Sequence, residues 1–363
     1  MRCAFFYHSL RSDWNHGNAH FLRGVVSEMQ RLGHTVDVFE PANGWSATQL
    51  QREQGAAALQ WFVQAYPGLT SHAYDMDELD LDAALDGTDV VLVHEWNDPE
   101  LVQRIGECRQ RCGFLLLFHD THHRAVSAPH ELRRFDLSNY DGVLAFGEIL
   151  RRAYLDNGWA ARAWTWHEAA DIRVFHPLPE SDVSCDLAWV GNWGDDERAQ
   201  ELRDFLIEPV AALQLDARIF GVRYPPAALA EIHQAHIEYC GWIPNFQVPA
   251  AFAAARLTVH VPRRYYTEQL PGIPTIRVFE ALACGIPLVS APWDDAEHLF
   301  QPGRDFLVAH TPAQMREHLE HLSSDPDFAL SIALHGYNTL CSRHTCAHRV
   351  RELLSICTSF GRV

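Results

Sequence analysis

Glu280 lies in an otherwise small and apolar stretch, RVFEALACGIPLVS, at residues 277–290. The stretch predicts a buried helix that stops at Gly285 and leads into a short strand, because Pro287 prevents further helix. A carboxylate in such a helix has two interpretations. It forms an ion pair with Arg277, one turn earlier, or it points into a cleft and accepts hydrogen bonds from the hydroxyl groups of a ligand.

Other polar side chains follow apolar runs that predict strands. His119 and Asp120 end one run, Glu95 ends another, and His16 lies in the polar loop after the first. Parallel α/β sheets bind ligands at the carboxyl ends of their strands, so these four side chains are candidates for acid–base chemistry. A structural role in the core is the competing interpretation for a lone histidine.

The elements that position these residues follow a repeated strand–helix–strand pattern, which predicts parallel sheets. Continuous apolar runs indicate strands that are covered on both faces. Helices are predicted over residues 19–33, 99–112, 197–213 and 312–324, and in the segment between Pro41 and Asp86. Strands are predicted over residues 1–9, 35–41, 88–96, 113–123, 140–148, 185–194, 216–221, 236–242, 257–262, 286–289 and 305–310.

This pattern predicts an α/β protein with two Rossmann-like doubly wound domains that face each other across a crevice. We expect an N-terminal domain at residues 1–170 and a C-terminal domain at residues 171–340, joined by a proline-containing linker at 172–185. Residues 341–363 predict a C-terminal helix that packs back on the N-terminal domain.

The charge balance excludes some partners. The 363 residues include 47 acidic and 29 basic ones, a net charge of −18, which disfavours nucleic acid and anionic membranes. The sequence has no run of 18 apolar residues, so no integral membrane segment is expected. The first residues predict a strand rather than a signal peptide, and we therefore expect a cytoplasmic protein.

The nine cysteines give two groups with metal-ligand residue types. Cys108 and Cys112 are spaced by one helical turn, and the stretch CSRHTCAH at 341–348 contains two cysteines and two histidines. Neither group has the paired spacing of a zinc finger, so no metal site is predicted.

Four stretches, in this order, carry a resemblance to a known family: DLAWVGNW, EYCGWIP, PGIPTIRVFEALACGIPLVSAPW and FLVAH. The sequence resembles glycosyltransferases of the GT-B fold with a group-1 C-terminal domain, and most closely the spore-maturation-protein-like branch. The resemblance covers most of the chain and is strongest over residues 185–308.

The resemblance implies roles for residues of the C-terminal domain. Glu280 matches the second glutamate of the family's E-x7-E motif, which binds ribose hydroxyls, and Gly272 stands where the first glutamate is usual. The loop that contains Gly272, Ile273 and Thr275 would approach a diphosphate through its backbone N–H groups and through the Thr275 hydroxyl. Gly191 matches the glycine after the first strand, and Trp242 and Ile243 match the place where the base packs. Asn192 stands where the family often has an arginine, and no lysine follows, so we expect Arg198 to replace them on the phosphates, with Arg277 as a second candidate.

The alternatives for these residues are structural. Arg198 is otherwise a solvated helix arginine, Arg277 a partner of Glu280, and Trp242 part of the core. In the N-terminal domain, the resemblance implies that His119 faces the donor sugar. It also implies that Gly17 and Asn18 contact the phosphate or sugar.

We therefore expect a metal-independent glycosyltransferase that moves a sugar from a nucleotide-diphosphate donor to a glycan, a small molecule or a protein. No cofactor is expected besides this co-substrate, and stereochemistry is left open. The alternatives are a nucleotide-sugar 2-epimerase on the same fold and a non-catalytic protein, which the missing first glutamate at position 272 favours.

Overall fold

The computed structural model describes residues 1–179 and 183–362. The chain forms two compact units, which are described separately. Unit 1 comprises residues 1–168 and 346–363, and unit 2 comprises residues 169–345. Part of the predicted linker, residues 180–182, and the last residue of the predicted C-terminal helix region lie outside the described residues.

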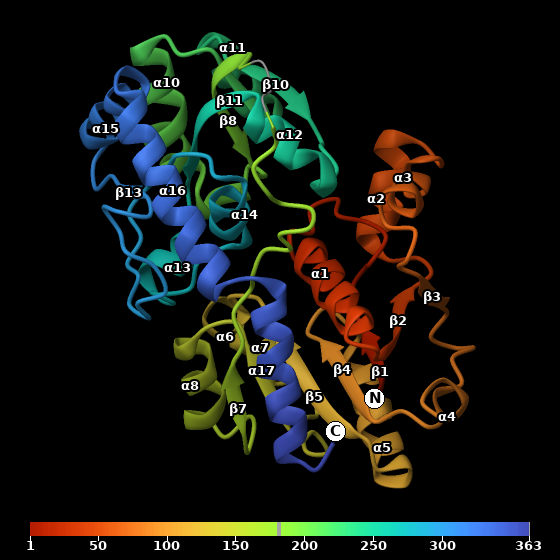
Figure 1. Cartoon of the computed structure of the whole chain (residues 1–363). Coiled ribbons are helices and arrows are strands. Elements are labelled where there is room, and N and C mark those ends of the chain that lie inside the picture. The colour runs from red at the N-terminus through yellow and green to blue at the C-terminus, as the bar shows by residue number, and fades with distance from the viewer. Residues whose placement is uncertain (180–182, 363) are drawn as a thin grey trace. The chain divides into compact units, whose positions relative to one another are not determined.

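Unit 1 contains a seven-stranded sheet in which every neighbouring pair of strands is parallel (Figure 1). The order is β3-β2-β1-β4-β5-β6-β7, so the chain builds outward in one direction from β1 and then in the other from β4. The strands are β1 (Arg2–Phe6), β2 (Thr35–Pro41), β3 (Ser71–Tyr74), β4 (Val90–His94), β5 (Leu115–Asp120), β6 (Gly142–Ala145) and β7 (Ala163–Thr165).

The helices of unit 1 cover this sheet. The last helix, α17, packs against α1, and the buried indole of Trp166 donates from Nε1 to the carbonyl oxygen of Arg349 at 2.8 Å. The helices are α1 (Asn18–Arg31), α2 (Trp45–Gln54), α3 (Ala58–Ala65), α4 (Leu81–Ala84), α5 (Pro99–Cys112), α6 (Arg124–Ser127), α7 (Pro129–Leu132), α8 (Glu148–Asp156) and α17 (Cys346–Ser359).

Unit 2 contains a six-stranded parallel sheet in the order β10-β9-β8-β11-β12-β13. Here the chain builds outward from β8 and then, in the other direction, from β11. The strands are β8 (Cys185–Val190), β9 (Ala217–Phe220), β10 (Glu238–Gly241), β11 (Ala255–His260), β12 (Leu288–Ser290) and β13 (Leu307–Val308). Two Rossmann-like doubly wound domains, as predicted, are confirmed.

Apolar clusters on both faces of this sheet form the core of unit 2, as the continuous apolar strands predict. Gly285 ends α14 with a φ of +65°, in agreement with the predicted stop. The α-helices are α9 (Ala199–Leu202), α10 (Glu208–Leu213), α11 (Pro226–Gln234), α12 (Val248–Ala253), α13 (Arg264–Glu268), α14 (Ile276–Cys284), α15 (Pro312–Ser324) and α16 (Pro326–Arg343). Short 3₁₀ turns occur at Asp195–Glu197 and Asn245–Gln247.

Two predictions of local structure were wrong. The predicted continuous helix over 197–213 is interrupted by a π-helical turn at Arg203–Ile207, just before Pro209, whose missing N–H cannot continue the regular ladder. The segment between Pro41 and Asp86 contains β3 as well as helices. This strand is short and at the sheet edge, with only Tyr74 buried, so it carries little apolar signal.

Within the described residues, no helix combines the length and apolar character that crossing a bilayer requires.

Candidate functional site

In unit 1, a buried polar cluster lies at the carboxyl ends of β1, β4 and β5. Tyr7 follows β1, His94 ends β4 and Glu95 follows it, and His119 and Asp120 end β5. All five side chains are at most 1% exposed. The sheet reverses its order between β1 and β4, which is the position where open α/β sheets bind ligands.

His119 is held by aromatic neighbours. Its Nδ1 lies 2.6 Å from the hydroxyl of Tyr7, and its ring is 5.4 Å from that of His94 and 4.8 Å from that of Trp166. The other ring nitrogen, Nε2, is buried without a hydrogen-bond partner among the described residues. Burial lowers the pKa of His119 well below its ordinary value, so the imidazole is neutral.

His94 and Glu95 form a close pair. His94 Nε2 lies 2.8 Å from Glu95 Oε2, and Thr121 donates from its hydroxyl to Glu95 Oε1 at 3.1 Å. Burial raises the pKa of Glu95 to about 7 and lowers that of His94 well below the ordinary range. The pair therefore holds a carboxyl group whose protonation changes near neutral pH, which suits acid–base chemistry.

Asp120 is more firmly fixed than Glu95. Its carboxylate accepts hydrogen bonds from the Tyr154 hydroxyl at 2.6 Å and from the backbone N–H of His122 at 3.0 Å. Burial, followed by the charge of Glu95, raises its pKa to about 7. Both carboxylate oxygens of Asp120 have protein partners, so Asp120 is better suited to organising this edge of the sheet than to contacting a substrate.

The loop before α1 and the first residue of α1 contribute three of the predicted residues. His16 is buried, its ring centroid is 5.0 Å from that of His8 and 6.4 Å from that of His94, and its Nε2 has no hydrogen-bond partner among the described residues. Gly17 precedes α1, and Asn18 donates from Nδ2 to Glu168 Oε1 at 3.0 Å. His16 therefore joins the strand-end cluster, whereas Asn18 has a structural partner.

In unit 2, Arg198 occupies the equivalent reversal point between β8 and β11. Its guanidinium donates to the carbonyl oxygen of Val261, just after β11, at 3.0 Å and to that of Asn192, just after β8. Its Nε is buried and has no partner, and no carboxylate pairs with it within the described residues. The side chain is half-buried, so the solvated-arginine interpretation does not describe it.

Electrostatics at this point favour an anion. Burial, followed by the charges of Arg263 and Arg277, lowers the pKa of Arg198 to about 9. His260, which ends β11, is buried and has its pKa lowered to about 3 by burial and then by the charge of Arg198. Arg263 is paired with Glu197 and Arg277 with Glu280, so Arg198 is the cation of this region that has no acidic partner among the described residues.

Glu280 is fully buried and paired with Arg277 on the same helix. Arg277 keeps 26% of its side chain exposed, so it is the solvent-facing member of the pair. The ion-pair interpretation of Glu280 therefore holds for this structure. The pair does not lie on a solvated edge of the helix, however, because the Glu280 carboxylate is fully buried.

The loop before α14 is fixed by hydrogen bonds. Thr275 is the N-cap residue of α14, and its hydroxyl lies 3.1 Å from His260 Nε2, while His260 Nδ1 lies 3.0 Å from the Ser290 hydroxyl. Gly272 has a φ of +92°, a conformation that strains any residue with a side chain. This backbone geometry accounts for a glycine at the position of the first glutamate of the motif. Ile273 is buried, and its carbonyl oxygen accepts from the Trp293 indole at 3.1 Å.

The remaining predicted residues lie around the ends of β8 and β10. The carbonyl oxygen of Gly191 accepts from the Tyr224 hydroxyl at 2.9 Å, and Asn192 Oδ1 accepts from the backbone N–H of Val222 at 3.0 Å. Trp242 and Ile243 are half-buried and directly follow β10, the edge strand two positions from β8.

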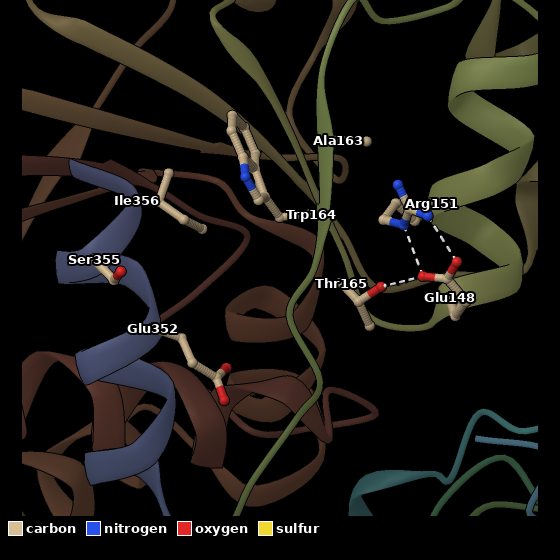
Figure 2. Close-up of a pocket in the computed structure, with 8 residues that line it drawn as sticks. All are labelled: Glu148, Arg151, Ala163, Trp164, Thr165, Glu352, Ser355 and Ile356. Atoms are coloured by element: carbon tan, nitrogen blue, oxygen red, sulfur yellow. Dashed lines mark hydrogen bonds and ion pairs between the residues drawn. The ribbon is translucent and has the colours of Figure 1, made fainter. Parts of the chain in front are cut away.

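A pocket of about 470 Å³ in unit 1 contains none of the predicted residues (Figure 2). Within this pocket, the Glu148 carboxylate accepts hydrogen bonds from the Thr165 hydroxyl and from the Arg151 guanidinium, so these three polar side chains of the pocket satisfy one another. Its lining comes from α8, β7 and α17: Glu148, Arg151, Ala163, Trp164, Thr165, Glu352, Ser355 and Ile356.

Sequence reasoning left out two residues of these sites, Tyr7 and His260, which both lie within predicted strands. His94 was recognised, like Glu95, by its place at the end of a predicted strand. A polar residue near the end of an apolar run is the signal that could have found the other two. Among residues 1–179 and 183–362, one group could hold a metal ion, Asp82 with Cys108 and Cys112, and it contains no residue of the strand-end clusters.

The architecture is shared with solved glycosyltransferases. Sucrose-phosphate synthase from Thermosynechococcus elongatus is similar with a TM-score of 0.69 and 13% identity over 99% of each chain. HepE from Anabaena, solved in complex with UDP and glucose, has a TM-score of 0.66 and 14% sequence identity, over 99% of this chain and 100% of the HepE chain. BGT from phage T4, in complex with its UDP-glucose substrate, has a TM-score of 0.61 and 13% sequence identity, over 98% of this chain and 99% of the BGT chain. The fold is therefore GT-B, as predicted.

Residues 199–355 match a family described as glycosyl transferase-like. With the GT-B fold, this match confirms the predicted enzyme class, a glycosyltransferase. No curated protein sequence is significantly similar to the chain. The narrower resemblance to the spore-maturation-protein-like branch stays a prediction.

Proposed function

We propose that the chain transfers a sugar from a nucleotide-diphosphate donor, bound by unit 2, to an acceptor. The observation that carries this proposal is the guanidinium of Arg198. It lies across the reversal point of the sheet of unit 2, bonded to two carbonyl oxygens and to no carboxylate of the described residues. A partly buried cation in this state is stabilised by an anionic ligand, and a diphosphate is the anion that glycosyltransferases of this fold release.

The diphosphate would be stabilised as it leaves. Arg198 supplies a fixed positive charge, Arg263 and Arg277 add to the local potential, and the first N–H groups of α14 point toward its N-terminal end. Charges placed in advance where negative charge develops lower the barrier to breaking the glycosidic bond. We therefore propose a metal-independent reaction that needs no cofactor besides the donor.

We propose that Glu280 binds the ribose hydroxyls after exchanging part of its contact with Arg277. Arg277 is partly exposed and can move toward the phosphates, which would leave the enclosed carboxylate to accept hydrogen bonds from ribose. Trp242 and Ile243 are proposed to pack on the base. UDP is the favoured nucleotide, because HepE and BGT were both solved with UDP or UDP-glucose.

On the acceptor side, Glu95 is the proposed acid–base group, since burial raises its pKa to about 7 and His94 lies beside it. His119 and His16 are proposed to line the same strand-end region, and Asp120 to organise it. The acceptor is a hydroxyl group of a glycan, a small molecule or a protein.

Calorimetric titration of UDP, GDP, dTDP and ADP tests the donor site. We expect micromolar binding of one nucleotide, UDP first, that is insensitive to a chelator and at least about tenfold weaker in Arg198→Gln, since a charge-assisted hydrogen bond is worth about 1.5–3 kcal/mol. Arg316→Gln is the matched control, because it removes a cation that already pairs with Glu208 on another helix.

The outcomes separate the alternatives. Binding that is lost in Arg198→Gln and kept in Arg316→Gln supports the donor site. Binding of none of the four nucleotides supports a non-catalytic protein instead. If a nucleotide sugar is converted to an altered sugar without an acceptor, the epimerase interpretation replaces transfer.

A further inference from the structure

A second chemical site lies in unit 1, away from the strand-end cluster. Asp82 belongs to the first turn of α4, and Cys108 and Cys112 occupy successive turns at the end of α5. One ligand atom from each lies within 4.8 Å of the other two. The two sulfur atoms are 3.6 Å apart, and the Cys108 thiol donates to Asp82 Oδ1 at 3.4 Å.

These separations match the edges of a tetrahedral zinc site. With Zn–S bonds of about 2.3 Å and Zn–O bonds of about 2.0–2.2 Å, two sulfurs are separated by roughly 3.8 Å, and a sulfur and an oxygen by roughly 3.5 Å. The observed 3.6 Å and 3.4 Å differ from these edges by a few tenths of an ångström or less. Two of the three separations therefore already fit one ion, and the third, between the Cys112 sulfur and an Asp82 oxygen, is at most 4.8 Å.

We propose that Asp82, Cys108 and Cys112 bind one thiophilic divalent cation, Zn²⁺, with water as the fourth ligand. On binding, each thiol transfers its proton to solvent and coordinates as a thiolate, and the carboxylate of Asp82 supplies one oxygen. Two thiolates and one carboxylate carry three negative charges against the two positive charges of the ion. Asp82 and Cys112 are exposed, so the ion reaches the site directly from solvent.

Arg111 competes with the ion for Asp82. Its Nη2 lies 2.5 Å from Asp82 Oδ1, the oxygen that also accepts from the Cys108 thiol. Both members of this ion pair are more than half exposed, at 59% and 66%, and exposed pairs contribute only about 0–1 kcal/mol. The ion therefore displaces Arg111 at small cost, and removing Arg111 is expected to strengthen binding.

The position of the site indicates a structural role. Helix α5 follows β4 and runs back along the parallel sheet, so its last turn lies toward the amino-terminal edge, opposite the His94–Glu95 pair. The segment that contains α4 is already tied to α5, because Arg104 donates to the carbonyl oxygens of Met76 and Leu79. A bound ion adds a link from α4 to the end of α5 and stabilises unit 1.

Titration of the reduced full-length protein with Cd²⁺, followed by the ultraviolet cadmium–thiolate charge-transfer band, tests this proposal. We expect one ion per chain. Affinity should fall by more than about 100-fold in Cys112→Ser, because loss of a direct ligand exceeds the 10–100-fold cost of losing an outer-shell partner. Asp82→Asn should also weaken binding, and Arg111→Gln should strengthen it by up to about fivefold.

Cys341→Ser is the matched control, since Cys341 is a partly exposed free cysteine of unit 2. It should leave the Cd²⁺ affinity unchanged. Zn²⁺ should raise the melting temperature of the unsubstituted protein and leave that of Cys112→Ser unchanged. A charge-transfer band that persists in Cys112→Ser overturns the proposal, and so does an Asp82→Asn protein that binds Cd²⁺ as tightly as the unsubstituted chain.

Discussion

Acidification from pH 7 to pH 5.5 is expected to destabilise unit 1, because its buried neutral histidines take up protons only when the chain unfolds. Burial lowers the pKa of His16, His94 and His119 well below the ordinary 6.5, and that of His8 to about 4. Their contribution to stability is fully present above pH 6.5 and is lost as the pH falls toward their folded-state pKa values.

Glu95 and Asp120 act in the opposite direction. Burial raises the pKa of each to about 7, so near pH 5.5 the folded unit holds about two protons on these carboxyl groups that the unfolded chain has released. At the same pH, the unfolded chain holds about four protons on the four histidines His8, His16, His94 and His119. The net uptake of about two protons on unfolding lowers the free energy of unfolding by ~2–3 kcal/mol per pH unit near pH 5.5.

Urea unfolding, monitored by hydrogen-exchange mass spectrometry of peptides from β4 and β5, measures this slope. His16→Gln removes one of the four histidines and should reduce the slope by ~1.4 kcal/mol per pH unit. His130→Gln is the control and should leave the slope unchanged, because His130 is exposed to solvent in the folded protein. A stability that stays constant or rises on acidification would refute the reasoning.

Three further substitutions test particular contacts. Gly272→Ala should destabilise unit 2 by ~1–2 kcal/mol in a thermal melt, since φ is +92° there, whereas an equal melting temperature would contradict the strained backbone. Tyr154→Phe removes the hydroxyl that donates to buried Asp120 and should lower the urea stability of unit 1 by ~1–3 kcal/mol, and no loss would mean that this hydrogen bond is not formed in solution. Trp166→Phe leaves the carbonyl oxygen of Arg349 without its indole donor, so hydrogen exchange in α17 should accelerate, and unchanged exchange would show that the contact does not hold the helix.

The layered architecture could be predicted from the sequence because its signals are local. Continuous apolar runs marked the strands around His94 and His119, and Gly285 with Pro287 marked the end of α14. Short edge strands such as β3 and β7 could not be found this way. They bury few side chains and therefore need little apolar sequence.

The candidate sites were predictable by residue type but not by environment. The sequence left Arg198 open between a solvated and a ligand-facing role, and the decision depends on Asn192 and Val261, which are 6 and 63 positions away. Likewise, the neutral state of His260 arises from burial and from the charge of Arg198. Such shifts come from contacts across the sheet, which no local pattern contains.

The return of α17 to unit 1 makes unit 2 an insertion within unit 1. Both ends of unit 2 lie side by side, since the backbone N–H of Ala170 donates to the carbonyl oxygen of His344 at 3.1 Å and Ala170 bridges Thr345. During synthesis, unit 2 has all of its residues before α17 has been made. Unit 1 begins first but is completed last, so the face of α1 that α17 covers stays open while the inserted unit folds.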